Sequence, residues 1–185
     1  NAANGNSKLG STWAEMRESQ AAALSLSNTG MVVSIDLGDA HDIHPRRKKE
    51  VAQRLAALAL QQTYGRKVEA GGPRYLSMSP ASNSIRLHFS SDNGLAIRPA
   101  ASSLQGFEIA GVDQLFYPAT AVIDGNSILV SAAEVRKPVA VRYAWADDAG
   151  NANLIDRNGW PAAPFRTDRW PAITQKEKYN PFQNW

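Results

Sequence analysis

The chain contains 185 residues, the size of one domain or of two small ones. Hydrophobic residues make up 43% and charged residues 20%, a globular composition that excludes disordered, collagen-like and coiled-coil proteins. No apolar stretch is long enough for a transmembrane helix, so we expect no membrane partner. The formal net charge is only +3 and is spread over the chain, so we expect no nucleic-acid partner. The absence of cysteine excludes disulfides, thiolate catalysis and thiolate metal sites.

Residues 1–10 open with a small, polar, Asn-rich stretch, Asn1 to Lys8. It has neither the basic start nor the apolar run of a signal peptide. Such a stretch is typical of an exposed loop or a frayed end. We therefore assign 1–10 to an exposed loop or to a cut end that a larger polypeptide once preceded.

The next segment, 11–65, is predicted to form a helix, a strand and a second helix. Ser11 and Thr12 compete as the N-cap of the first helix. The run at 31–37 is almost continuously apolar and rich in β-branched residues, which is typical of a strand buried on both faces in a parallel sheet. The second helix is predicted from Arg46 to Tyr64.

Gly65 is expected to end that second helix in the left-handed conformation. Helix, parallel strand and helix together make one βα unit of a doubly wound sheet. A single strand has no neighbours, so 11–65 is interpreted as a piece of a larger α/β domain.

After Gly65 the hydrophobic period changes to two, which predicts a β-rich sandwich domain over 66–150. The inward-facing side chains are expected to be Ile85, Leu87, Phe89, Val139, Val141 and Tyr143. The sequence Asp124-Gly125-Asn126 predicts a hairpin turn between two short strands. The last segment, 151–185, is predicted to be an irregular tail rich in Pro and Trp that lies over other surfaces.

The candidate site for catalysis is the loop that follows the predicted strand, because ligands bind at the carboxyl ends of strands in doubly wound sheets. His44 directly precedes Pro45, so it is predicted to cap the second helix. The helix N-terminus and the cations of the next turn both disfavour a positive imidazole, leaving the neutral form that a general base needs. Asp42 is the nearest carboxylate in sequence, with Asp39 and Asp36 before it.

Two other interpretations of this loop stay open. An Asp-x-His sequence before a helix is most often a simple capping loop. Alternatively, His41, His44, Asp39 and Asp42 could bind a metal, but a His pair spaced i, i+3 converges only on a helix, and this pair precedes one. We therefore expect no metal site.

Several motifs in order carry a family resemblance. They are Ser-Thr-Trp-Ala-Glu-Met-Arg-Glu-Ser-Gln at 11–20, Gly-Asp-Ala-His-Asp-Ile-His-Pro-Arg-Arg-Lys at 38–48 and Ala-Val-Arg-Tyr-Ala-Trp-Ala at 140–146, continued at 153–154 and 161–168. Together they resemble the C-terminal portion of bacterial sialate O-acetylesterases, which belong to the SGNH hydrolase superfamily.

The resemblance implies an α/β fold: the C-terminal βα part of an SGNH-type three-layer α/β/α domain, followed by a β-sandwich-like segment. It implies that His44 is the catalytic histidine. The superfamily often has Asp three residues before that histidine; here His41 holds that position and Asp42 lies two before. The acid is therefore Asp42, another aspartate (Asp39 or Asp36), or absent in a Ser-His dyad steadied by a backbone carbonyl.

By this resemblance the chain is the C-terminal fragment of a carbohydrate O-acetylesterase that uses a serine-histidine mechanism without a cofactor. The serine and the oxyanion-hole donors would lie on an N-terminal polypeptide of the same enzyme. The substrate would be acetylated sialic acid or an acetylated polysaccharide, and the enzyme would be secreted or periplasmic. The alternative is a non-catalytic carbohydrate-binding module in which the β-rich part does the binding.

Overall fold

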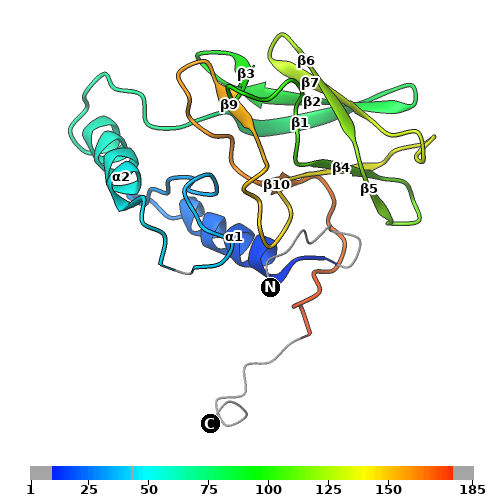
Figure 1. Ribbon diagram of the computed structural model, residues 1–185, viewed down its shortest axis with the longest axis horizontal. Coiled ribbons are helices and arrows are strands. Elements are labelled where there is room, and N and C mark those ends of the chain that lie inside the picture. Colours follow the sequence, from blue (N-terminus) through cyan, green and yellow to red (C-terminus); the bar gives the residue numbers. More distant parts are fainter. Residues whose placement is uncertain (1–9, 43, 177–185) are drawn as a thin grey trace.

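The computed structural model describes residues 10–42 and 44–176, so the expectation for residues 1–9 lies outside the described part. Helix α1 spans Thr12–Ala22 and continues as a 3₁₀ turn, Ala23–Ser25 (Figure 1). Ser11 rather than Thr12 is its N-cap, because the Ser11 hydroxyl accepts a hydrogen bond from the Ala14 amide at 3.1 Å. No helix among the described residues is both long and apolar enough to cross a membrane.

Helix α2 spans Lys48–Gln62, two residues shorter at each end than the sequence predicts. Gly65 has φ +61°, the left-handed conformation expected of it. The next amide, that of Arg66, bonds back to the carbonyl of Leu60 at 2.9 Å and so satisfies one of the last carbonyls of the helix.

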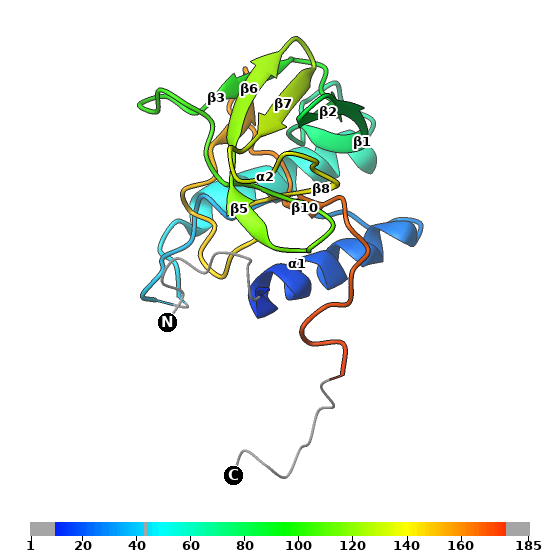
Figure 2. The same ribbon diagram turned by 90° about the vertical axis from the view of Figure 1, so that its right-hand side faces the viewer.

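The strands form two four-stranded antiparallel sheets and one two-stranded sheet. The first has the order β1 (Arg74–Ala81), β2 (Ser84–Ser90), β7 (Ser127–Ser131), β6 (Thr120–Asp124). The second has the order β10 (Phe165–Arg166), β8 (Ala140–Tyr143), β4 (Phe107–Ala110), β5 (Phe116–Pro118). Strands β3 (Leu95–Ile97) and β9 (Leu154–Asp156) pair separately. Figure 2 shows the first sheet above and β5, β8 and β10 below it, nearer to α1.

The main hydrophobic core lies between the two larger sheets, as the sandwich prediction requires. Of the side chains predicted to face inward, Ile85, Leu87, Phe89, Val141 and Tyr143 are buried. The prediction that Val139 faces inward is wrong, since its side chain is 38% exposed and it precedes the first residue of β8. The hairpin prediction is confirmed: β6 pairs with β7 around Gly125, whose φ is +59°.

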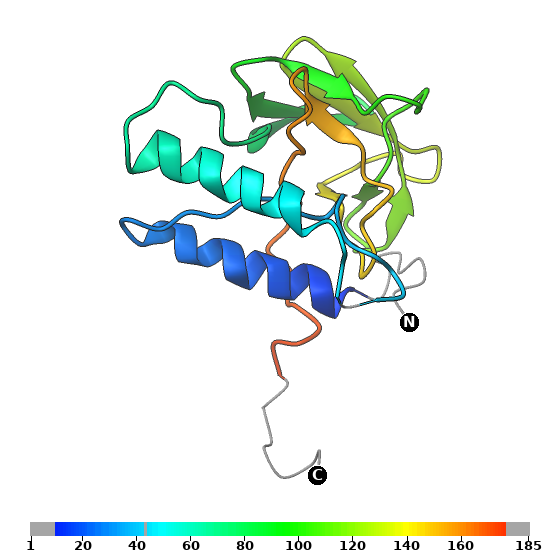
Figure 3. The ribbon, with the colours of Figure 1, turned by 60° about the vertical axis from the view of Figure 1, so that its left-hand side comes forward.

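The prediction of a strand at 31–37 is wrong for the described chain. Residues 31–34 are extended and 35–37 form a turn, with no ladder to another strand. Figure 3 shows this segment returning between α1 and α2. An extended segment becomes a strand only when a neighbour satisfies its backbone groups. The described part is therefore a mixed α/β structure with mainly antiparallel sheets, and the three-layer SGNH arrangement is not present in it.

The prediction of an irregular tail is wrong for two of its segments. Strand β9 pairs with β3, and β10 pairs with β8, so residues 154–166 belong to the β-rich part. Both strands are only two or three residues long, too short to show a period of two. Further along, the tail packs on α1 as predicted: the amides of Ile173 and Thr174 donate to the Glu15 carboxylate at 2.8 and 3.0 Å.

A chain of ion pairs joins α1 to the second sheet. Asp168, whose side chain is 1% exposed, accepts from Arg142 at 2.9 and 3.1 Å and lies 3.4 Å from Arg166. Arg166 in turn makes a bidentate pair with Glu18 of α1 at 2.8 and 2.9 Å. The hydrogen bond and charge of Glu18 are the main cause that raises the pKa of Arg166.

Replacing the buried member of this chain should be costly. We expect Asp168→Asn to lower the free energy of unfolding by about 3 kcal/mol, because the enclosed Arg142 loses the charge of its bidentate partner and Arg166 keeps only Glu18. The matched control is Asp124→Asn, which removes the ion pair between Arg86 and Asp124. The Asp124 side chain is 66% exposed, so this change should lower the free energy of unfolding by about 1 kcal/mol or less. Urea unfolding of both variants measures the difference, and equal losses would contradict the structural role of Asp168.

Candidate functional site

The loop before α2 is built on two short turns closed by aspartates. The Asp39 carboxylate accepts from the His41 amide at 2.9 Å, and the Asp42 carboxylate accepts from the His44 amide at 2.8 Å. Side chains that bond an amide two residues ahead stabilise such turns. Asp39 and Asp42 also form an isolated antiparallel bridge. This local pairing gives the loop a defined shape, although it contains neither helix nor strand.

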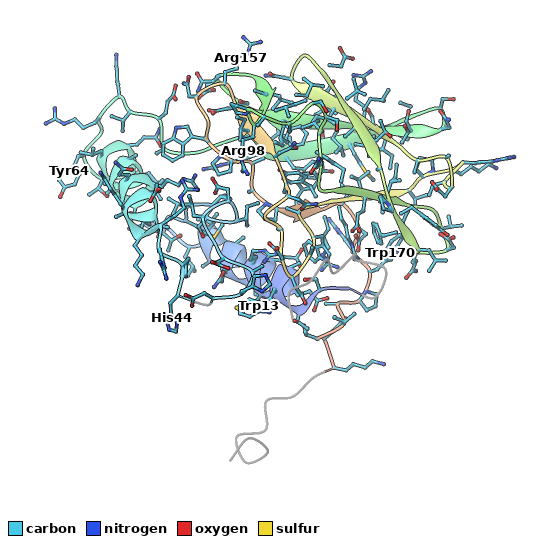
Figure 4. The ribbon with its side chains drawn as sticks, viewed as in Figure 1. Trp13, His44, Tyr64, Arg98, Arg157 and Trp170 are labelled. Carbon is cyan, nitrogen blue, oxygen red and sulfur yellow. The ribbon has the colours of Figure 1, made fainter. Side chains whose placement is uncertain are left out.

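The two residues of the predicted catalytic pair lie together. His44 Nδ1 is 3.3 Å from Asp42 Oδ1. The His44 side chain is 79% exposed and the Asp42 side chain 46% exposed. Figure 4 shows His44 at the outer edge of the molecule, directed away from the sheets. Among the described residues, no serine hydroxyl bonds to this ring, so its Nε2 atom is open to a group from outside.

The prediction that His44 caps α2 is wrong. The N-cap is Arg47, whose side chain makes no capping bond, and the helix begins at Lys48. His44 lies a full turn before that point, so the helix dipole does not act on its ring as the sequence interpretation assumed. Any restraint on the imidazole comes instead from Asp42.

Asp36 does not contact this histidine, because another residue takes both of its carboxylate oxygens. Arg54 of α2 donates to Oδ1 and to Oδ2, each at 2.7 Å. Burial alone would raise the pKa of the Asp36 carboxyl, but the hydrogen bonds and charge of Arg54, with Arg98 at 3.9 Å, hold that pKa below its ordinary value.

The open metal interpretation gains no support from the geometry. Within the described residues, no three His, Cys, Asp or Glu side chains lie close enough together to hold a metal ion. His41 and Asp39 therefore act, as far as the described part shows, in the loop's own hydrogen bonding.

A pocket of about 530 Å³ lies beside the loop. It is lined by residues from three places: α1, the loop, and the turn after β8. Those that sequence reasoning missed are Trp13, Arg17, Asp147 and Asp148. The adjacent acids at 147 and 148 come shortly after β8, but only the fold brings them to the loop, so the sequence offers little signal for them. His44 itself does not line this pocket.

The pair of Asp36 and Arg54 generates a pH prediction. A carboxyl whose pKa is lowered on folding contributes stability above its unfolded value, here 3.8, and loses that contribution as the pH falls through the folded value. We therefore expect Asp36→Asn to be less stable than the native sequence at pH 7, with a gap that narrows below about pH 4. Urea unfolding at a series of pH values tests this, and a gap independent of pH would contradict it. Asp124→Asn, at an exposed site, serves as the control.

No protein-family model matches the sequence, and no curated protein matches it. Among solved structures, the chain is similar to the crystal structure of a carbohydrate acetylesterase from Xanthomonas citri, with a TM-score of 0.86 and 42% sequence identity. The similarity covers 91% of this chain and 39% of that one. The chain thus spans well under half the length of the protein that it resembles in both sequence and fold.

Proposed function

We propose that this chain is part of a carbohydrate acetylesterase, an enzyme that hydrolyses acetyl esters on sugar hydroxyls. The observation that carries the proposal is the 42% identity, over 91% of this chain, to the carbohydrate acetylesterase from Xanthomonas citri. Identity at this level, together with a TM-score of 0.86, means that the likeness extends from the fold to the side chains.

In the proposed mechanism His44 is the general base and acid. Its Nε2 atom takes the proton from a serine hydroxyl as the serine oxygen attacks the acetyl carbonyl. The proton then passes to the departing sugar oxygen, and His44 next activates the water that splits acetyl-serine into acetate and free serine. Asp42, 3.3 Å from Nδ1, would keep the proton on that nitrogen and stabilise the imidazolium.

The serine and the donors for the oxyanion are proposed to come from an N-terminal polypeptide of the same enzyme. Support comes from the extended segment at 31–34, which lines two apolar grooves together with residues of α1 and of the β10 region. Within the described residues, the backbone groups of Met31 and Val32 have no hydrogen-bond partner. Val32, Val33 and Ile35 are half-buried, so a neighbouring strand would complete their burial.

The charge of the pocket beside the loop bears on the choice of sugar. Five aspartates line it, against one cation, Arg17, among its described lining residues: Asp36, Asp39, Asp42, Asp147 and Asp148. Such a surface disfavours an anionic sugar such as sialic acid. Trp13 is 49% exposed and offers a flat apolar face to a sugar ring. We therefore propose a neutral acetylated polysaccharide as the substrate, which also agrees with a secreted or periplasmic enzyme.

The decisive variant is His44→Ala, studied together with the serine-bearing polypeptide. Turnover of a chromogenic acetyl ester should fall by about 10³-fold or more, because the members of a catalytic unit act together. The free energy of unfolding should change by no more than about 1 kcal/mol, since the side chain is exposed. His41→Ala is the matched control and should keep its activity. Undiminished turnover in His44→Ala would end the catalytic proposal and favour a non-catalytic carbohydrate-binding module.

Asp42→Asn then distinguishes a triad from a dyad. If the Asp42 carboxylate orients the imidazole, turnover should fall by about 10²-fold or more, since the wrong tautomer becomes available. A change of less than about threefold would mean a Ser-His dyad, with catalysis by His44 still intact.

Substrate choice gives a separate prediction. The assembled enzyme should release acetate from acetylated xylan faster than from O-acetylated sialic acid, measured as kcat/KM. Neutralising two acids of the pocket, in Asp147→Asn/Asp148→Asn, should improve the relative rate on the sialic acid by about tenfold, because each removed charge lessens the repulsion. A preference for sialic acid in the native sequence would overturn the neutral-sugar proposal without touching the esterase chemistry.

A further inference from the structure

The ion pair between Arg54 and Asp36 is one of the most enclosed in the described part of the chain. The two side chains are 14% and 12% exposed. Arg54 donates a hydrogen bond to each carboxylate oxygen of Asp36 at 2.7 Å and another to the backbone carbonyl of Val33 at 2.6 Å. A bidentate pair of this kind fixes orientation as well as distance. Arg54 therefore binds the end of the extended segment to the middle of α2.

This pair closes the base of the catalytic loop proposed above. Asp36 lies just before the loop and Arg54 lies on the helix after it, 18 residues further along the chain. Arg47, at the start of α2, adds a weaker contact to the Asp36 carbonyl at 3.4 Å. Leu37, which follows Asp36 directly, is also buried, with 2% of its surface exposed.

Among the described residues of the loop, the side-chain hydrogen bonds reach only two residues along the chain. They join Asp39 to His41 and Asp42 to His44, and they shape the loop without attaching it to the rest of the molecule. The His44 ring is too exposed to be held by packing. The position of the Asp42–His44 pair therefore depends on the base of the loop.

We infer that Arg54, acting through Asp36, is a positioning residue for the Asp42–His44 pair. Its meaning for catalysis rests on the proposed esterase function. The same pair explains why Asp36, an acid available by sequence, is not placed to orient the histidine: its two oxygens already bind Arg54.

The placement of the pair has a spectroscopic signature. A carboxylate oxygen 3.3 Å from Nδ1 favours the neutral ring that carries its proton on Nδ1 and leaves Nε2 as the acceptor. The nitrogen-15 shifts of a histidine ring report this tautomer. The chain has only three histidines, His41, His44 and His88, so the His44 signals can be assigned by single substitutions.

The experiment measures the Nδ1–H fraction of His44 in the full 185-residue chain at a pH where the ring is neutral. Asp42→Ala defines the value without the carboxylate. We expect Arg54→Met to lose at least half of the difference between the native sequence and Asp42→Ala. Arg54→Lys, which can keep one hydrogen bond to Asp36, should recover part of it. The matched control Arg86→Met removes the more exposed pair with Asp124 and should keep the native value.

A second variant guards against failure to fold. Arg54→Met leaves the enclosed Asp36 carboxylate with only the more distant Arg98 as its counter-charge, whereas Asp36→Asn/Arg54→Gln removes both charges of the pair and keeps two hydrogen-bonding groups. It should show the same loss of the Nδ1–H form. The inference is overturned if this folded double variant keeps the native tautomer. It is also overturned if Asp42→Ala equals the native sequence, since no pair would then exist to position.

A kinetic arm separates this inference from the proposed function. With the serine-bearing polypeptide present, Arg54→Met should lower kcat by about 10²-fold with KM changed less than about threefold, as expected for a misplaced base. Absence of esterase activity in the native assembly would remove the proposed function and leave the tautomer result standing. A loss of activity in His44→Ala but not in Arg54→Met would remove the positioning role alone.

Discussion

A buried carboxylate, that of Asp168, lies at the centre of the ion pairs that join α1 to the second sheet. Asp168 lies between the guanidinium groups of Arg142 and Arg166, and Arg166 passes the connection to Glu18 on α1. The Arg142 guanidinium also lies 4.0 Å from the centre of the Phe116 ring, so the charge is enclosed by aromatic surface as well as by its partner. The direction of α1, and with it the path of the extended segment towards the loop, depends on this arrangement.

Three of the motifs that carry the family resemblance, at 11–20, 140–146 and 161–168, lie where α1 meets the second sheet. The hydroxyl of Ser11 bonds to Asp147, and Arg17 donates to the carbonyls of residues 144 and 146. The motif at 38–48 differs from the others because its side chains are exposed and bond mainly to one another. The resemblance therefore combines two kinds of motif: some attach α1 to the β-rich part, and the one at 38–48 is where chemistry is proposed.

Local patterns predicted the structure well where the pattern and the partner lie close together in sequence. The two helices and the β6–β7 hairpin followed from periodicity and turn residues, and the Asp42–His44 contact followed from a spacing of two. Pairing at a distance could not be predicted in the same way. The run at 31–37 lacks its neighbour, β9 and β10 are too short to show a period, and the acids at 147 and 148 reach the pocket only through the fold.

The bonds between Glu15 and residues 173 and 174 have a consequence for the order in which the molecule assembles. They join positions 158 and 159 residues apart, and the pair of Glu18 with Arg166 spans 148. During synthesis α1 leaves the ribosome well before residues 166–174, so it has to wait for these attachments beside an unfinished sandwich. Because local contacts close shorter loops than these, we expect the hairpins of the sandwich to form before α1 docks.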